Sequence, residues 1–370
     1  MKIVFIPSLP YTYRDHKRLG VELFLEKGYD VEVMDIHKVL IPGYKEKVNI
    51  EYFTFEKHWE PNNIEEIVER CKKLSENDFI FFYINEVTIL HKIQEKAKAK
   101  FITFIGGSIP ISSVYCKKLL HYKLQFKNLI KNLLPKYKIK PFSTDYFISG
   151  SPKDELIFPY LINKNTKVYK SNSRDYNLCL KSEPFQTINK YCVFLDTDVI
   201  DASDYILSKE GKKDNLDNYL RKIISFFKLI EKKFMVSVII SAHPKSRIYK
   251  NKTELEGIKI VHGKSVELVQ GSEFVINEGT TAISYAIFFQ KPIIFFTFKE
   301  IDFFYEYTCT FAKELKKAII NIDKLDFDLF QKELLNFTYY DYYKNQYLTY
   351  FDAKQDTFEM VEKEIFQKNA

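Results

Sequence analysis

The sequence predicts an α/β protein of two Rossmann-like domains, and three observations lead to this fold class. Short runs of β-branched and aromatic residues alternate with segments of helical spacing along most of the chain, which is typical of parallel sheets covered by helices. With 370 residues, the chain is long enough for two domains that each bury a core. The residues with the most chemistry follow directly after predicted strands, where parallel sheets collect their ligands.

The composition is that of a folded, water-exposed protein. Apolar residues make up 46% and charged residues 28%, and no run approaches the ~20 apolar residues of a membrane span. Residues 1–6 predict a first strand rather than a secretory signal, because the apolar run is short. The five cysteines have neither disulfide nor metal spacing. We therefore expect reduced thiols and a cytoplasmic location.

The net charge limits the classes of binding partner that we expect. A formal charge of +7 fits an enzyme of anionic donors, or peripheral contact with the anionic inner face of the cytoplasmic membrane. The basic residues are dispersed and form no nucleic-acid-binding motif. We therefore do not expect nucleic acid as a partner.

The first domain, residues 1–180, opens with a βαβ unit: a strand over 2–6, a helix over 20–27 and a strand over 30–35. After this unit, apolar spacing predicts helices over 64–74 and 93–99, and strands over 78–84, 101–105 and 145–148. We expect 145–148 to be the last strand of this domain. The strand over 101–105 ends in Gly106-Gly107, which allows either a close approach of the backbone to a ligand or an ordinary turn.

The second domain, residues 181–350, repeats the alternation, and residues 351–370 predict a last helix that returns to the first domain. Strands are predicted over 191–195, 236–240, 258–261, 273–276 and 291–296. Helices are predicted over 216–232, 266–269, 282–289, 325–335 and 351–366.

Polar residues gather after three strands of the second domain. Gly279, Thr280 and Thr281 follow a buried strand and are predicted to open a helix, so N–H groups and hydroxyls would point at one phosphate. His243-Pro244 lies at the tip of a neighbouring strand and offers a ring donor. The alternative is that Gly-Thr-Thr is an ordinary helix cap and His-Pro a turn. The full set of predicted donor-binding residues is Ser241, His243, Pro244, Lys245, Arg247, His262, Gly263, Lys264, Ser265, Glu278, Gly279, Thr280 and Thr281.

An acidic pair, Asp196 and Asp198, follows the strand over 191–195. Two carboxylates one residue apart can share a divalent cation with a donor diphosphate. They can equally face the acceptor or cap a helix. We do not favour a bound metal and expect no cofactor.

The stretch from Ser265 to Phe296 resembles the matching part of the CDP-glycerol glycerophosphotransferases. The pairing of His243-Pro244 with Thr280-Thr281 resembles the motifs with which bacterial sialyltransferases and Kdo transferases hold CMP. The whole block is similar to the C-terminal domain of GT-B glycosyltransferases of bacterial surface polysaccharides. This resemblance implies two Rossmann-like domains facing a cleft, with the donor nucleotide in the second domain and the acceptor mainly in the first.

The same resemblance implies a catalytic base on the first domain. The loop after the first strand carries Asp15 and His16, which are candidates to deprotonate an acceptor hydroxyl. The alternative is that Asp15 caps a helix and His16 is an exposed residue of its first turn. Asp196 and Asp198 remain candidates for the same role.

We therefore expect a metal-independent glycosyltransferase of capsule or lipopolysaccharide biosynthesis. It would move a CMP-activated acidic sugar, a nonulosonate or Kdo, onto a bacterial surface glycan or glycolipid. The alternatives are a CDP-glycerol or CDP-ribitol polyol-phosphate transferase, a UDP-sugar GT-B transferase, and a non-catalytic nucleotide-sugar-binding assembly protein.

Overall fold

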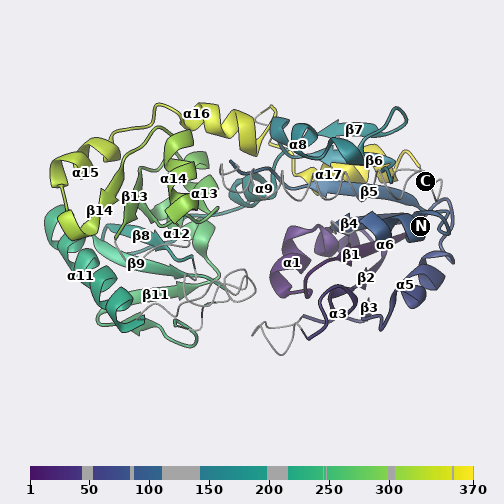
Figure 1. Ribbon diagram of the computed structural model, residues 1–370, viewed down its shortest axis with the longest axis horizontal. Helices are drawn as coiled ribbons and strands as arrows, with labels where there is room; N and C mark the ends of the chain where they lie inside the picture. Colours follow the sequence, from purple (N-terminus) through teal and green to yellow (C-terminus); the bar gives the residue numbers. More distant parts are fainter. Residues whose placement is uncertain are drawn as a thin grey trace, which may run out of the picture. The chain divides into compact units, whose positions relative to one another are not determined.

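The computed structural model describes residues 1–43, 53–83, 87–110, 142–197, 216–244, 246, 248–298, 305–351 and 354–369 (Figure 1). Its internal contacts divide the chain into two units. Unit 1 holds the described residues of 1–108, 142–177 and 346–369, and unit 2 those of 109–110 and 178–345. The observed division after Asn177 lies three residues before the boundary expected from the sequence.

Unit 1 is built on a parallel sheet with the strand order β3-β2-β1-β4-β5-β6-β7. Its strands are β1 (Lys2–Pro7), β2 (Asp30–Met34), β3 (His58–Trp59), β4 (Phe79–Tyr83), β5 (Lys100–Ile105), β6 (Tyr146–Ser149) and β7 (Lys167–Lys170). The expectation that β6 ends the sheet is wrong, because β7 pairs with it along four residues. β7 was not predicted because its alternation is too polar to stand out from a loop.

Helices cover both faces of this sheet (Figure 1). One face packs on α2 (Val21–Glu26) and on the C-terminal segment, where Phe366 lies 4.8 Å from the ring of Phe79. The other face packs on α5 (Ile64–Cys71) and α6 (Val87–Gln94). The remaining helices are α1 (Tyr13–Arg18), α3 (His37–Leu40), α8 (Pro152–Ile157), η1 (Pro159–Leu161), α9 (Arg174–Leu180), α17 (Thr357–Val361) and η4 (Glu362–Phe366).

Unit 2 has the strand order β10-β11-β9-β8-β12-β13-β14, which matches that of unit 1 except for one edge strand in each, the short β10 here and β7 in unit 1. All its pairs are parallel except the short antiparallel pair of β10 and β11. The strands are β8 (Tyr191–Leu195), β9 (Ser237–Ala242), β10 (Glu254–Leu255), β11 (Ile258–His262), β12 (Val275–Asn277), β13 (Ile293–Thr297) and β14 (Ile319–Asn321).

One long amphipathic helix, α11 (Leu216–Phe234), lines the main core of unit 2. Its Phe227 lies 5.1 Å from the ring of Phe194 in β8. No helix within the described residues is long and apolar enough to cross a bilayer. The other helices are α12 (Ser265–Gly271), α13 (Ile283–Phe288), α14 (Tyr305–Glu314), η2 (Ile322–Lys324), α15 (Phe327–Leu334), α16 (Tyr340–Tyr343) and η3 (Lys344–Leu348).

In both units the strand order reverses beside the first strand. The chain adds strands on one side of β1 or β8, then crosses to add β4 or β12 on the other side. This order is that of the Rossmann fold, which binds ligands at the reversal, beyond the carboxyl ends of the strands. The prediction of two Rossmann-like units is therefore confirmed.

Candidate functional site

Asp196 connects the loops that follow the two central strands of unit 2. It comes directly after β8 and is 6% exposed. Its Oδ2 accepts a hydrogen bond from the backbone N–H of His243 at 2.9 Å, and its own N–H donates to the carbonyl of Ser241 at 3.2 Å. Three residues predicted separately are therefore brought together. Three further predicted site residues lie outside the described part of the chain: Asp198, Lys245 and Arg247.

Two buried hydroxyls at the same edge have no hydrogen-bond partner within the described residues. Thr197 Oγ1 follows β8, Ser246 Oγ follows β9, and their side chains are 7% and 6% exposed. An unpaired buried hydroxyl costs about 1–3 kcal/mol. Both hydroxyls are donors of the kind that phosphate oxygens accept. Neither residue is among the site residues predicted from the sequence, although Thr197 stands between the two acidic candidates.

The ends of β9 and β11 are joined by two serines. Ser241 Oγ and Ser265 Oγ lie 2.8 Å apart, so Ser265 anchors the start of α12 beside the Asp196 loop. Gly263 has a φ of +69°, which turns the chain into this helix. His262 and Lys264 are exposed, and His262 donates through Nε2 to a carbonyl of the preceding loop at 3.0 Å.

The Gly-Thr-Thr segment forms a turn before the helix rather than its first residues. Gly279 has a φ of +102°, which is not helical, and α13 begins only at Ile283. The N–H of Gly279 donates to the side chain of Asn277 at 2.7 Å. Thr280 Oγ1 accepts from the N–H of Ala282 at 3.3 Å. The helix predicted over 282–289 therefore begins one residue later, and Gly279 to Thr281 form the turn before it. The hydroxyl of Thr280 has a local capping role, which a contact with the nucleotide donor would have to share.

Glu278 is fully buried beside Tyr219 of α11. The Tyr219 hydroxyl lies 2.8 Å from Glu278 Oε2 and 3.1 Å from Oε1. Burial raises the pKa of Glu278 well above its ordinary value, and the nearby charge of Asp196 raises it further. Burial therefore favours the protonated form of this carboxyl. The structure gives this predicted donor-binding residue a packing role behind the edge.

In unit 1, Asp15 is a helix-capping residue. Its carboxylate accepts from the Thr12 hydroxyl at 2.6 Å, and its N–H donates to Thr12 Oγ1 at 3.2 Å, which completes a capping box for α1. This is the alternative reading weighed for Asp15.

His16 is buried, so the alternative of an exposed first-turn residue is wrong. It is 8% exposed, and its ring lies 4.8 Å from that of Phe53. Its Nδ1 lies 3.0 Å from the Tyr11 hydroxyl. Burial lowers the pKa of His16 below the usual 6.5, so the imidazole is neutral at neutral pH. A neutral imidazole can accept a proton, which is the property required of a general base.

Metal-type ligands meet at one place within the described residues. One ligand atom each from Asp35, His58 and Glu60 lies within 4.8 Å of the others. Asp35 already accepts from the N–H of Tyr11 at 2.7 Å, and Glu60 pairs with Lys38. Because these carboxylates have protein partners, we interpret the cluster as a network that supports the Tyr11 loop.

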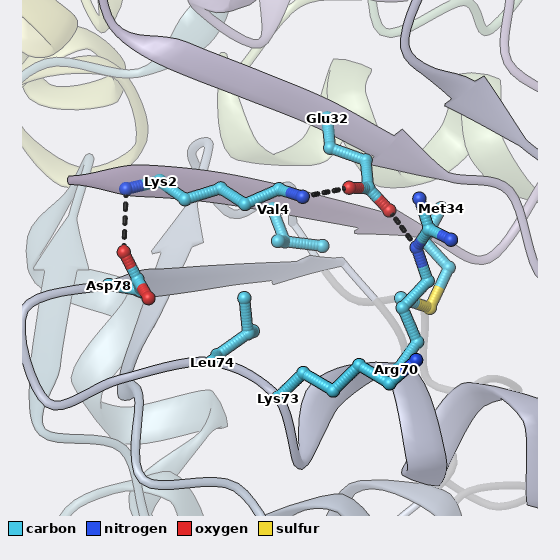
Figure 2. A pocket seen from close by; sticks show the side chains of 8 residues that line it. All are labelled: Lys2, Val4, Glu32, Met34, Arg70, Lys73, Leu74 and Asp78. Atoms are coloured by element: carbon cyan, nitrogen blue, oxygen red, sulfur yellow. Dashed lines mark hydrogen bonds and ion pairs between the residues drawn. The ribbon is translucent and has the colours of Figure 1, made fainter.

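A pocket of about 290 Å³ lies at the opposite, amino end of the unit 1 strands (Figure 2). Except for Lys73, its charged residues are bonded to one another: Glu32 bonds to both Lys2 and Arg70, and the Lys2 backbone N–H donates to Asp78 at 2.7 Å. These pairs leave little charge for a ligand. The pocket therefore does not compete with the carboxyl edges as a functional site.

The sequence matches no protein-family model and no curated protein. The fold, in contrast, is similar to solved structures. The UDP-GlcNAc 2-epimerase of Methanocaldococcus jannaschii aligns with a TM-score of 0.50 and 12% identity, over 99% of this chain and 100% of that chain. The wall teichoic acid polymerase TagF aligns with a TM-score of 0.51 and 13% identity, over 99% of this chain and 89% of that chain. At these identities the likeness establishes the shared double-Rossmann, GT-B fold.

Proposed function

We propose that this chain is a glycosyltransferase that binds a nucleotide sugar at the carboxyl edge of unit 2 and transfers the sugar to an acceptor at unit 1. The observation that carries the proposal is the pair of unpartnered, buried hydroxyls of Thr197 and Ser246. They flank the Asp196–His243 contact beside the strand reversal, where Rossmann sheets bind nucleotides. The similar fold of an epimerase named for UDP-GlcNAc supports this class of donor.

For the donor we propose a CMP-activated acidic sugar, a nonulosonate or Kdo. The support is the sequence pairing of His243-Pro244 with Thr280-Thr281. Because β9 and β12 both pair with β8, their ends are separated by two strand spacings, or about 10 Å. A nucleoside phosphate is long enough to reach from one to the other. The acceptor in this proposal is a bacterial surface glycan or glycolipid, in capsule or lipopolysaccharide.

In the proposed reaction, His16 removes the proton of an acceptor hydroxyl as its oxygen attacks the anomeric carbon. The bond between that carbon and the phosphate oxygen breaks, and the electron pair leaves with the nucleotide. Hydrogen-bond donors that point at the departing phosphate stabilise its charge. We give this role to Thr197, Ser246 and His243. We propose that no divalent metal is needed, because Asp196 already accepts a protein hydrogen bond.

Tyr11 sets which nitrogen of His16 can accept the proton. If Nδ1–H donates to the Tyr11 oxygen, Nε2 carries the free lone pair and can act as the base. Burial raises the pKa of Tyr11, so the phenol stays protonated. Tyr11 is therefore a positioning residue in this mechanism.

A thermal-shift panel tests the donor. CMP, CDP, UDP, GDP and ADP are compared with and without magnesium, since a ligand of the native state raises its melting temperature. A shift with CMP that needs no magnesium is expected. A magnesium-dependent shift with UDP or GDP would overturn the CMP and metal-free parts of the proposal and favour the acidic pair at Asp196 and Asp198.

Two measurements separate the alternatives. Product analysis distinguishes a sugar transferase from a CDP-glycerol or CDP-ribitol transferase, because the first forms a glycosidic bond and the second a phosphodiester. Single substitutions of Asp15, His16, Asp196 and Asp198 test for a non-catalytic binding protein. If none lowers turnover while nucleotide binding persists, the acid–base assignment is wrong.

The charge of +7 supports a further proposal of peripheral membrane contact. Flotation with liposomes that contain anionic phospholipid is expected to carry the protein upward at low salt. Equal behaviour with neutral and anionic liposomes would remove this part of the proposal.

A further inference from the structure

A second ligand-binding feature lies at the carboxyl edge of unit 1. Arg174, the first residue of α9, is partly buried, and within the described residues its guanidinium has neither a hydrogen bond nor an ion pair. Its backbone N–H donates to the carbonyl of Gly106, directly after β5, at 2.9 Å. This places an uncompensated cation beside the strand ends where a Rossmann unit collects its ligand.

Neighbouring groups do not neutralise Arg174. Arg18 adds a second positive charge, and the carboxylate of Asp175 pairs with Arg18 at 3.3 Å. Asp15 is held by its capping bonds to Thr12. Burial lowers the pKa of Arg174 and the charge of Arg18 lowers it further, while Tyr83, Asp175 and Asp15 oppose this shift without reversing it.

Tyr83 provides a donor at the same edge. It ends β4, and its buried hydroxyl has no hydrogen-bond partner within the described residues. Burial raises the pKa of Tyr83 and keeps the phenol protonated. Because β4 pairs with β5, Tyr83 lies beside the end of β5, where the backbone of Arg174 is bonded to Gly106. A cation and a neutral O–H donor are complementary to an anionic oxygen.

The Gly106-Gly107 pair makes room for this arginine. A Cβ on Gly106 would lie 2.0 Å from Arg174 Nε and 2.8 Å from its Cδ. Gly107 has a φ of +101°, and a Cβ there would lie 2.5 Å from Cβ of Ser173. The glycine pair thus lets the start of α9 pack on the end of β5, with Arg174 across it.

We propose that unit 1 binds an acceptor with an anionic group, either a phosphate or a carboxylate, through the guanidinium of Arg174 and the hydroxyl of Tyr83. This inference deepens the proposed function, because it names the chemical class of the acceptor. Arg174 and Arg18 hold the anion, while His16 of the neighbouring α1 receives the proton of the attacking hydroxyl. A planar guanidinium suits the paired oxygens of either group.

The experiment measures binding of small probes to the full chain by calorimetry. Glycerol 1-phosphate and glucuronate represent the two anionic sources, and glycerol and glucose are their neutral counterparts. At least one anion is expected to bind at millimolar concentration while its neutral counterpart does not. The stronger of the two anions identifies the source.

Variants test whether the anion binds at Arg174. Arg174→Gln is expected to weaken binding at least tenfold, and Gly106→Ala is expected to do the same by displacing Arg174. Arg70→Gln is the matched control, because Arg70 is paired with Glu32 at the other end of the same sheet (Figure 2). Circular dichroism confirms that each variant is folded, and Arg174→Gln provides the test if Gly106→Ala is not.

The outcomes separate this inference from the proposed function. Equal binding of anionic and neutral probes overturns it, as does full binding by Arg174→Gln. Binding lost in Thr197→Val but kept in Arg174→Gln places the anion in unit 2 and also overturns it. A CMP-dependent thermal shift that Arg174→Gln retains would keep the nucleotide proposal standing in each of these cases.

Discussion

The two sheets have the same strand order apart from one edge strand in each, β7 and the short β10, but the carboxyl edge of each carries different side chains. The edge of unit 1 carries aromatic side chains and cations beside carboxylates that already have protein partners, whereas that of unit 2 carries hydroxyls and the carboxylate of Asp196. The groups compared are Tyr11, His16, Tyr83 and Arg174 in unit 1, and Asp196, Thr197, His243 and Ser246 in unit 2.

This difference separates the role of the sheets, which place the loops, from that of the loop residues, which bind ligands. The reversal of strand order places loops from non-adjacent parts of the chain at one edge in both units. The residues in those loops then decide what each edge can bind. Hydroxyl donors beside a carboxylate suit a neutralised or hydrogen-bonded phosphate, whereas an unpaired guanidinium suits a free anion. The proposed roles, donor binding by unit 2 and acceptor binding by unit 1, therefore depend on the loops and not on the sheets.

The largest expected effect is on turnover. His16→Asn should lower kcat by about 10²–10⁴-fold, because it removes the general base, while CMP affinity changes less than twofold. Steady-state kinetics and calorimetry measure the two quantities. The matched control is His91→Gln, a histidine of α6 in the same unit that contacts Glu95 at 3.5 Å. Equal losses in both variants would remove His16 from the mechanism.

The next effect is on stability, at the buried pair behind the unit 2 edge. Tyr219→Phe should reduce the free energy of unfolding by about 1–3 kcal/mol, because Glu278 loses its partner in the core. Glu278→Gln should cost less than about 1 kcal/mol at neutral pH, since a protonated carboxyl and an amide are isosteric. Urea unfolding measures both. A larger loss in Glu278→Gln than in Tyr219→Phe would show that the carboxyl is ionised.

The same pair gives a pH dependence with a defined sign. The pKa of Glu278 is raised in the folded state, so the folded protein binds a proton that the unfolded chain releases above 4.5. The contribution of Glu278 is therefore complete below pH 4.5 and is lost as the pH rises through the folded pKa. Melting temperatures of the wild type and Glu278→Gln should diverge in that direction, and parallel curves would contradict the assignment.

A smaller effect is expected at Thr197, where a substitution should weaken nucleotide binding without lowering stability. Thr197→Val should weaken nucleotide binding about tenfold, or ~1.4 kcal/mol, but leave the protein as stable as before or more stable. The reason is that valine replaces an unpartnered buried hydroxyl by a methyl group. Thr144→Val is the control, because its hydroxyl donates to a backbone carbonyl of unit 1 at 2.8 Å and its loss should destabilise. Destabilisation by both variants would show that Thr197 has a structural partner.

The smallest effect is on the pH profile of activity. Burial lowers the pKa of His16, so the base stays unprotonated further into the acid range. The acidic limb of kcat/KM is therefore expected below pH 6.5. A limb at or above that value would exclude the buried histidine as the base.

The sequence was sufficient for the parts of the fold that depend on local pattern. Buried strands such as β8 and β13 are continuous apolar runs, and α11 has a clear helical spacing. The three-residue β14 was not predicted, because Ile319–Asn321 is too short to show a period. It becomes a strand only because β13 offers it an edge.

The candidate site divides in the same way. Asp196, Ser241 and His243 were predicted because each directly follows a recognisable strand. The contact of Tyr219 with Glu278 was not, because it joins α11 to the loop after β12 across 59 residues. Arg174 was also missed, since its significance lies in what does not pair with it. Such properties depend on packing between distant segments and leave no local signal.

The most direct test of the account is where the nucleotide binds. The thermal shift produced by CMP is measured for the wild type, Thr197→Val and Arg174→Gln, each at several ligand concentrations. The account predicts a shift that Thr197→Val largely loses and Arg174→Gln keeps. A shift that Arg174→Gln loses and Thr197→Val keeps would place the nucleotide in unit 1 and contradict the division of labour between the two sheets.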